Sequence, residues 1–225
     1  MKGLQVFYGG TFDPVHDGHL AVALAARDAL DAHVRLVPAA DPPHRAPPGA
    51  SAMHRARMLD LAVAGERGLS VDRRELARGG RSYSIDTLRG IRDELGPDAP
   101  VAWLVGADSF RDLPHWRDWQ DLFDLAHFIV AERPGAPLDA LPAPLARFVT
   151  ARWCEDAAAL AAAPAGRVWR LRQPLQSESG TQVRNAIAAD IGIGGLVPPA
   201  VAEYIHRHAL YRAQPGDGAS GPAPL

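Results

Sequence analysis

Short apolar runs alternate with amphipathic helical patterns along most of the chain. This alternation is typical of a parallel sheet wrapped by helices, because successive parallel strands need a crossover connection between them. The apolar runs predict strands at residues 4–8, 33–37, 69–73, 101–105, 128–131 and 168–171. Apolar residues at helical spacing predict helices at residues 19–32, 51–64, 84–95 (with Ser84 as its cap), 180–190 and 198–208.

Proline and alanine mark the less regular parts of the chain. Residues 41–48 contain too many prolines for a helix or a central strand. Residues 138–164 are rich in alanine and proline, and we expect them to be helical. Residues 213–225 have little to bury and are expected to form a disordered tail. We therefore expect one doubly wound, Rossmann-like α/β domain over residues 1–212, with a small helical C-terminal portion from about residue 175.

Composition narrows the possible partners. The 225 residues include 24 basic and 26 acidic side chains, so the net charge of −2 provides no basic field for nucleic acid. The single cysteine, Cys154, excludes an internal disulfide framework. No apolar run approaches the roughly 18 residues that a membrane helix needs, and the N-terminus lacks a signal-peptide pattern. We expect a soluble, cytoplasmic protein that binds neither nucleic acid nor membrane.

The segment after the first expected strand carries the strongest chemical signal. Ligands of open α/β sheets bind beyond the C-terminal ends of the strands. Gly9 and Gly10 let backbone amides approach an anion closely, and the helix that follows opens with unpaired amides. His16 and His19 are three residues apart, so both imidazoles can face this positive helix end. Each feature alone has a simpler interpretation, a turn or a surface or metal-binding histidine pair, but together they favour a polyphosphate site.

Two motifs point to one superfamily. Residues 9–19 lack the spacing of a P-loop or of a dinucleotide fold, and His16 to His19 resemble the H-x-G-H signature of the nucleotidyltransferases. Near the other end, Thr181 and Arg184 lie on one face of an expected helix start, where a hydroxyl and a guanidinium suit phosphates. Ser179 by itself is equally explained as an N-cap. This segment resembles the I-S-x-T-x-x-R motif of the same superfamily, with Glu178 in place of isoleucine.

Intermediate segments narrow the resemblance to one family. They are Pro42-Pro43-His44-Arg45, Ser82-Tyr83-Ser84-Ile85-Asp86-Thr87-Leu88, Gly106-Ala107-Asp108-Ser109, Trp116 with Trp119, Arg133-Pro134-Gly135 and Leu196-Val197-Pro198-Pro199 with Tyr204-Ile205 and Leu210-Tyr211. In this order they resemble the bacterial nicotinate-nucleotide adenylyltransferases. The resemblance covers residues 1–212.

The resemblance implies a role for each matching residue. ATP would be bound by Gly9, Gly10, Thr11, Phe12, His16, His19, Arg133, Ser179, Thr181 and Arg184. Within that set, His16, His19 and Arg184 would be catalytic, the histidines at the α-phosphoryl group and the arginine at the leaving pyrophosphate. Nicotinate mononucleotide would be bound by His44, Arg45, Tyr83, Ser84, Asp86, Asp108 and Trp116. Two alternatives stay open: Trp116 and Trp119 as a core or interface pair, and Asp108 as a helix cap.

The implied reaction is adenylyl transfer from ATP to nicotinate mononucleotide, giving deamido-NAD and pyrophosphate in NAD biosynthesis. It would proceed by direct in-line attack, with Mg²⁺ arriving on ATP and no metal held by the protein alone. One rival is another H-x-G-H enzyme, phosphopantetheine adenylyltransferase, which should lack the segments around Tyr83 and Trp116. A second rival is a non-catalytic nucleotide sensor, for which two transition-state histidines would have no purpose.

Overall fold

A single parallel sheet organises the molecule. The computed structural model describes residues 3–43, 47–132, 138, 141–173 and 178–212. Within them, seven strands pair in the order β3-β2-β1-β4-β5-β7-β6, every pair parallel. The strands are β1 Gln5–Gly10, β2 Val34–Pro38, β3 Leu69–Val71, β4 Val101–Gly106, β5 His127–Ala131, β6 Trp153–Cys154 and β7 Val168–Leu171. The predicted doubly wound α/β fold is confirmed.

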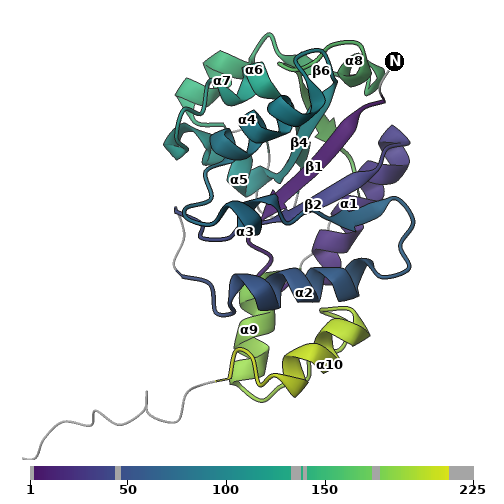
Figure 1. Ribbon diagram of the computed structural model, residues 1–225, viewed down its shortest axis with the longest axis vertical. Helices are drawn as coiled ribbons and strands as arrows, with labels where there is room; N and C mark the ends of the chain where they lie inside the picture. The colour runs from purple at the N-terminus through teal and green to yellow at the C-terminus, as the bar shows by residue number, and fades with distance from the viewer. Residues whose placement is uncertain (1–2, 44–46, 133–137, 139–140, 174–177, 213–225) are drawn as a thin grey trace, which may run out of the picture.

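Helices cover both faces of this sheet (Figure 1). They are α1 Asp17–Leu30, α2 Ala52–Val63, α3 Arg74–Arg78, α4 Ser84–Leu95, α5 Ala107–Arg111, α6 Leu122–Leu125, α7 Ala143–Val149, α8 Ala158–Ala161, α9 Gly180–Ala188 and α10 Pro199–Arg207, with a 3₁₀ turn at Leu113–His115. Side chains alternate along each strand, so Val6 and Tyr8 join the core beneath α1 and α2, whereas Phe7 joins the core beneath α4 to α7. Strands buried on both faces explain the continuous apolar runs of the sequence.

The C-terminal helices α9 and α10 lie beside α2, at the end of the molecule away from α6 and α7 (Figure 1). Both helices pack against the core on the α1 and α2 face through Val183 of α9 and through Val201 and Ile205 of α10. The expected helical C-terminal portion is therefore packed on the main domain. No described helix is both long and apolar enough to cross a bilayer.

Three predictions about elements were wrong. Residues 138–164, expected to be helical, contain α7 and α8 separated by β6, whose Trp153 pairs with Val168 at the sheet edge. A two-residue strand is too short to show the alternating pattern of a strand in the sequence. Pairing with the free edge of β7 stabilises β6 more than the helix propensity of the nearby alanines would stabilise a helix. Helix α1 begins at Asp17 rather than at residue 19. Helix α4 begins at Ser84 itself, with Tyr83 in the N-cap position, so Ser84 does not cap it.

The sheet reverses its winding direction between β1 and β4. From β1 the chain proceeds through β2 to β3 on one side, and β4 then pairs with the opposite edge of β1. Connections that diverge in this way leave a crevice beyond the C-terminal ends of the two central strands. Gly10 and Gly106 are the last residues of β1 and β4, so the glycine segments singled out in the sequence meet at this crevice.

Candidate active site

Two adjoining cavities occupy the crevice. The histidine cavity, of about 500 Å³, is lined by the loop after β1, the start of α1 and the start of α9. The tryptophan cavity, of about 420 Å³, is lined by the start of α4 and the segment after α5. The wall common to both consists of Gly9, Gly10, Thr11, Asp108 and Ser109. Two ligands can therefore lie side by side, separated by the end of β1 with Thr11 and by the first turn of α5.

Gly9 and Gly10 belong to β1 and do not form a turn. A Cβ on Gly9 would lie 2.2 Å from the Trp103 ring, and one on Gly10 would lie 2.8 Å from the Phe12 ring. Neither glycine has a positive φ. Both positions therefore require glycine because aromatic rings pack directly against the strand, a reason that differs from the turn suggested by the sequence.

His16 and His19 converge in the histidine cavity, as predicted. Their ring centroids are 3.7 Å apart, and His16 is only 7% exposed. The backbone N–H of His16, the N-cap residue of α1, donates to Nδ1 of His19 at 3.3 Å. Because Nδ1 of His19 accepts this bond, the neutral ring carries its proton on Nε2. The site thus holds two adjacent imidazoles at a helix N-terminus, where backbone amides and the helix dipole favour an anion.

The start of α9 forms the opposite side of the histidine cavity. Ser179 Oγ accepts a bond from the Gln182 backbone N–H at 3.1 Å, which confirms the capping alternative for Ser179. Arg184 Nη2 donates to Thr181 Oγ1 at 3.2 Å, so the predicted i, i+3 pair is formed. All three predicted residues line the cavity.

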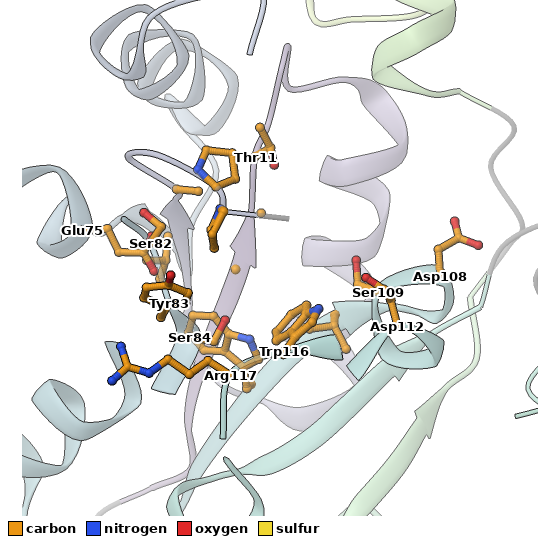
Figure 2. A pocket seen from close by; sticks show the side chains of 18 residues that line it. Thr11, Glu75, Ser82, Tyr83, Ser84, Asp108, Ser109, Asp112, Trp116 and Arg117 are labelled. Carbon is orange, nitrogen blue, oxygen red and sulfur yellow. The ribbon is translucent and has the colours of Figure 1, made fainter. Parts of the chain in front are cut away.

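The tryptophan cavity lies between two groups of side chains (Figure 2). Tyr83 and Ser84 stand on one side, and Trp116 stands on the other with Ser109 and Asp112. Trp119 instead packs against Phe123 and Phe148, with ring centroids 6.5 and 5.0 Å away. The core alternative therefore holds for Trp119, whereas Trp116 presents its ring to the cavity.

Three acidic or basic residues change the predicted picture of this cavity. Asp108 lies in the first turn of α5 on the wall common to both cavities, and the N-cap of that helix is Gly106, so the capping alternative for Asp108 is wrong. Asp86 lines neither cavity. Its carboxylate lies 3.9 Å from Arg117, which itself lines the tryptophan cavity with its guanidinium carbon 5.1 Å from the centroid of the Tyr83 ring.

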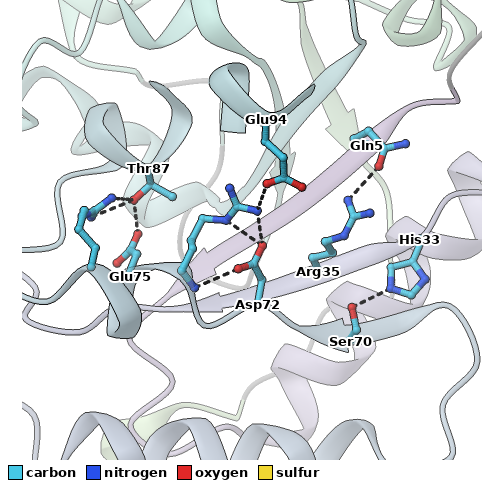
Figure 3. Close-up of polar contacts among 10 residues, drawn as sticks. Gln5, His33, Arg35, Ser70, Asp72, Glu75, Thr87 and Glu94 are labelled. Atoms are coloured by element: carbon cyan, nitrogen blue, oxygen red, sulfur yellow. Dashed lines mark hydrogen bonds and ion pairs between the residues drawn. The ribbon is translucent and has the colours of Figure 1, made fainter. Parts of the chain in front are cut away.

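Sequence reasoning missed several residues that support the cavities. Glu75 is 4% exposed, lines the tryptophan cavity and accepts a 2.7 Å bond from Thr87 Oγ1 (Figure 3). Ser82 Oγ accepts bonds from the Ala40 and Asp41 backbone amides at 2.8 and 3.2 Å, joining two walls. The Nε1 atom of Trp103, on the same cavity, is buried without a hydrogen-bond partner among the described residues.

Arg55 is a further missed residue, and the sequence did carry a signal for it. It is 1% exposed and donates to the carbonyls of Thr11, Ala40 and Ala50 at 2.7, 3.1 and 3.2 Å. An arginine on the apolar face of a predicted helix is unusual, because buried charges need partners. Its partners are backbone carbonyls next to the crevice, so Arg55 fixes the loop after β1. Three predicted ligand residues, His44, Arg45 and Arg133, lie outside the described residues.

Comparison with known proteins identifies the family of the chain. The sequence model of the cytidylyltransferase-like family matches residues 7–186. A Stenotrophomonas maltophilia protein named as a probable nicotinate-nucleotide adenylyltransferase is 55% identical over 95% of this chain and 99% of its own. A protein of the same name from Marinobacter nauticus is 44% identical over 96% of this chain and 100% of its own.

Solved structures share the fold. The Plasmodium falciparum nicotinic acid mononucleotide adenylyltransferase, complexed with NaAD, superposes with a TM-score of 0.72 at 17% identity, over 94% of this chain and 98% of its own. The extent of the family match and the high identity to the bacterial proteins lead to one conclusion. The chain belongs to the cytidylyltransferase-like family and, within it, to the nicotinate-nucleotide adenylyltransferases.

Proposed function

We propose that the chain transfers the adenylyl group of ATP to nicotinate mononucleotide, releasing pyrophosphate and forming deamido-NAD, without a covalent enzyme intermediate. One observation carries the proposal: two cavities, one with paired imidazoles and an arginine and the other with an aromatic ring, meet at a common wall. ATP would occupy the histidine cavity, and the pyridine nucleotide would occupy the tryptophan cavity. The two reacting phosphates would then meet beside Gly10 and Thr11.

The chemistry needs positioning and charge stabilisation, and no protein nucleophile. A phosphate oxygen of the mononucleotide, ionised at neutral pH, attacks the α-phosphorus of ATP. A new P–O bond forms, the bond to the bridging oxygen of the β-phosphate breaks, and pyrophosphate leaves with the electron pair. Nε2–H of His19, together with the His16 ring, would stabilise the charge on the α-phosphoryl oxygens. Arg184 and Thr181 would bind the leaving pyrophosphate.

Mg²⁺ would enter with ATP. The described lining of the histidine cavity contains four carboxylates, Asp13, Asp108, Glu132 and Glu178, but Arg184 is its sole arginine. A bare triphosphate would meet repulsion in such a cavity, whereas a magnesium complex carries less negative charge. Mg²⁺ prefers oxygen ligands and retains several of its water molecules. The carboxylate of Asp108, on the common wall, could accept hydrogen bonds from those waters. When bound, the ion would offset charge on the departing pyrophosphate.

Selection of the acid over the amide would depend on positive potential in the tryptophan cavity. Helix α4 begins at Ser84, so its first unpaired amides and the positive end of its dipole adjoin the cavity. Arg117 adds a guanidinium beside Tyr83. Charge-assisted hydrogen bonds contribute about 1.5–3 kcal/mol each. Two such bonds would give a preference of about a hundredfold or more for nicotinate over nicotinamide mononucleotide.

The test is product formation by the purified chain. Incubation with MgATP and nicotinate mononucleotide should yield deamido-NAD and pyrophosphate in equal amounts, identified by mass spectrometry and a coupled pyrophosphate assay. Phosphopantetheine, offered in parallel, should yield no adenylylated product. ATP binding without pyrophosphate release would overturn the enzymatic proposal. Equal kcat/KM values for the nicotinate and nicotinamide mononucleotides would overturn the acid selectivity alone.

A further inference from the structure

The carboxylate of Asp13 joins segments that are far apart in the sequence. Asp13 lies in the loop between β1 and α1, and its side chain is 9% exposed. Its Oδ2 accepts the backbone N–H of Gly49 at 2.7 Å, and its Oδ1 accepts the backbone N–H of Ala50 at 3.1 Å and the hydroxyl of Tyr211 at 2.8 Å. The loop that ends at the paired histidines is therefore tied to the segment before α2 and to the segment after α10.

The same residue orients Arg184. Nη1 of Arg184 donates to the Asp13 carbonyl at 2.6 Å and lies 3.7 Å from Asp13 Oδ2. Nη2 donates to Thr181 Oγ1 at 3.2 Å. A guanidinium is planar and has five N–H donors, so these bonds set its plane while other donors can still face a phosphate. The position of Arg184 in the histidine cavity thus depends on where Asp13 is held.

Close packing around Asp13 leaves little freedom. A Cβ on Gly180 would lie 2.9 Å from the Asp13 carbonyl oxygen, and a Cβ on Gly49 would lie 2.9 Å from the Tyr211 ring. Tyr211 adopts a left-handed backbone conformation, with φ of 63°. An aromatic residue keeps such a conformation only where surrounding contacts enforce it. Burial and the Asp13 carboxylate raise the pKa of Tyr211 far above its ordinary range, so its hydroxyl remains a donor.

We propose that Tyr211 is a positioning residue for the nucleotide half of the site: through Asp13 it holds Arg184 in the orientation that receives the triphosphate. Tyr211 does not itself line the histidine cavity, so it acts through Asp13 and Arg184, which do. This inference rests on the proposed function only in assigning the anion at Arg184 to ATP and pyrophosphate.

Loss of the Tyr211 hydroxyl should disturb that orientation in a defined direction. The Asp13 carboxylate would lose one of the three hydrogen-bond donors that the described residues provide, and its charge would be less well satisfied. Arg184, already in an ion pair with Oδ2 at 3.7 Å, would be drawn closer to the carboxylate and away from the phosphates. Binding of ATP and pyrophosphate should weaken about tenfold, the scale of one hydrogen bond to a charged group. Binding of nicotinate mononucleotide in the other cavity should not change.

Tyr204 offers a matched control. Its hydroxyl also makes one side-chain bond, to Nδ1 of His54 at 2.9 Å where α10 packs on α2, and it lines neither cavity. We expect Tyr211→Phe to raise the KM of ATP and, in the reverse reaction, of pyrophosphate, with the KM of nicotinate mononucleotide unchanged. Tyr204→Phe should leave all three values unchanged. Equal KM values for the two variants, or an equal rise for both substrates in Tyr211→Phe, would overturn the proposal.

A double-mutant cycle tests the route through Arg184. Arg184→Lys removes the planar fork that Asp13 orients, so adding Tyr211→Phe to it should cause little further loss of ATP affinity. Additive losses would mean that Tyr211 acts elsewhere. Affinity for α,β-methylene-ATP, measured by calorimetry, gives the same comparison without catalysis. A weaker Tyr211→Phe complex would therefore support the positioning role even if the wild type formed no deamido-NAD, and an unchanged complex would refute it.

Discussion

At the scale of single residues, the proposed chemistry depends most on His16 and His19. Their rings lie 3.7 Å apart at the N-terminus of α1, and a backbone N–H holds Nδ1 of His19. Groups that are already oriented before the substrate binds need not reorganise when charge develops in the transition state. This preorganisation is the physical basis of electrostatic catalysis. The pair is therefore the part of the site whose removal should affect the rate most directly.

Replacing either histidine should slow the chemical step. His16→Ala and His19→Ala are each expected to lower kcat by on the order of 10²–10³, the scale for losing one donor in a preorganised site. Steady-state kinetics with saturating ATP and nicotinate mononucleotide measures this loss. His33→Ala is the control, because His33 bonds Ser70 and lines neither cavity. Near-normal turnover in a folded His16 or His19 variant would remove that residue from the catalytic assignment.

Trp116 should contribute affinity but no selectivity. Nicotinate and nicotinamide rings present the same aromatic face, so loss of stacking in Trp116→Ala should weaken both mononucleotides alike. The expected cost is about 1–3 kcal/mol for each, if base stacking on aromatic side chains is a fair guide. Competition experiments with both mononucleotides give the acid-to-amide ratio, which should equal that of the wild type. A changed ratio would mean that Trp116 contacts the carboxylate of nicotinate. As a control, Trp116→Phe retains an aromatic ring and should keep most of the affinity for both mononucleotides.

At the scale of elements, the start of α9 combines a helix cap with the residues proposed to bind pyrophosphate. Ser179 caps the helix, and Thr181 and Arg184 form a bonded pair just after it. Arg184→Ala should therefore reduce kcat/KM for ATP by about tenfold to a hundredfold, as expected for one or more charge-assisted bonds. Affinity for nicotinate mononucleotide should stay within about twofold to threefold of wild type, which is roughly the precision of such context-dependent energies. Quenching of the protein's tryptophan fluorescence on titration with the mononucleotide measures this affinity. Equal weakening of both ligands would locate Arg184 outside the pyrophosphate site.

Strand β1 ends in a tight contact that limits substitution. A Cβ on Gly9 would lie 2.2 Å from the Trp103 ring, which is 2% exposed and cannot move into solvent. Gly9→Ala should lower the free energy of unfolding by about 1–3 kcal/mol, as for other overpacked cores. Urea denaturation measures this change, and the double variant Gly9→Ala with Trp103→Leu should recover part of it. Gly3→Ala, at a position with open space, is the control.

Buried polar groups connect elements at the scale of the whole molecule. Glu75 on α3 accepts a bond from Thr87 on α4 (Figure 3). Ser82 ties the segment before α4 to the loop after β2. Burial is the largest effect on Glu75 and raises the pKa of its carboxyl above the ordinary 4.5, while Thr87, Ser82 and Arg78 oppose the rise. The carboxyl therefore binds its proton more tightly in the folded state than in the unfolded state.

Stability should consequently depend on pH through Glu75. A raised pKa in the folded state contributes stability below the ordinary pKa, and that contribution is lost as pH rises through the raised value. The free energy of unfolding of the wild type should therefore fall relative to Glu75→Gln as pH increases from about 4.5 towards neutrality. Urea unfolding at several pH values measures the difference. Glu94→Gln, on the exposed face of α4, should follow the wild type, and parallel curves for Glu75→Gln would contradict the prediction.

Much of the site was predictable because its motifs are local. Thr181 and Arg184 are three residues apart within α9, and His16 and His19 are three residues apart across the start of α1, so local backbone geometry brings each pair together. Asp86 was assigned to the mononucleotide site from its motif, yet it lies beside Arg117 and off the cavity. Membership of a motif identifies a segment, whereas the direction of a side chain within it depends on neighbours that the segment does not contain.

The sequence by itself determined the fold class and indicated the candidate phosphate-binding residues after β1 and at the start of α9, because hydrophobic periodicity and helix-start residues act within a few positions of the chain. Tertiary structure decided what the glycines do and which residues support the ligands. Gly9 faces Trp103, Arg55 holds Thr11, and Tyr211 reaches Asp13 from 198 positions away. Such contacts leave no local pattern in the sequence, because each of the two segments can form its helix, strand or loop without the other. Only the closing of the chain around the β1–β4 crevice brings them together.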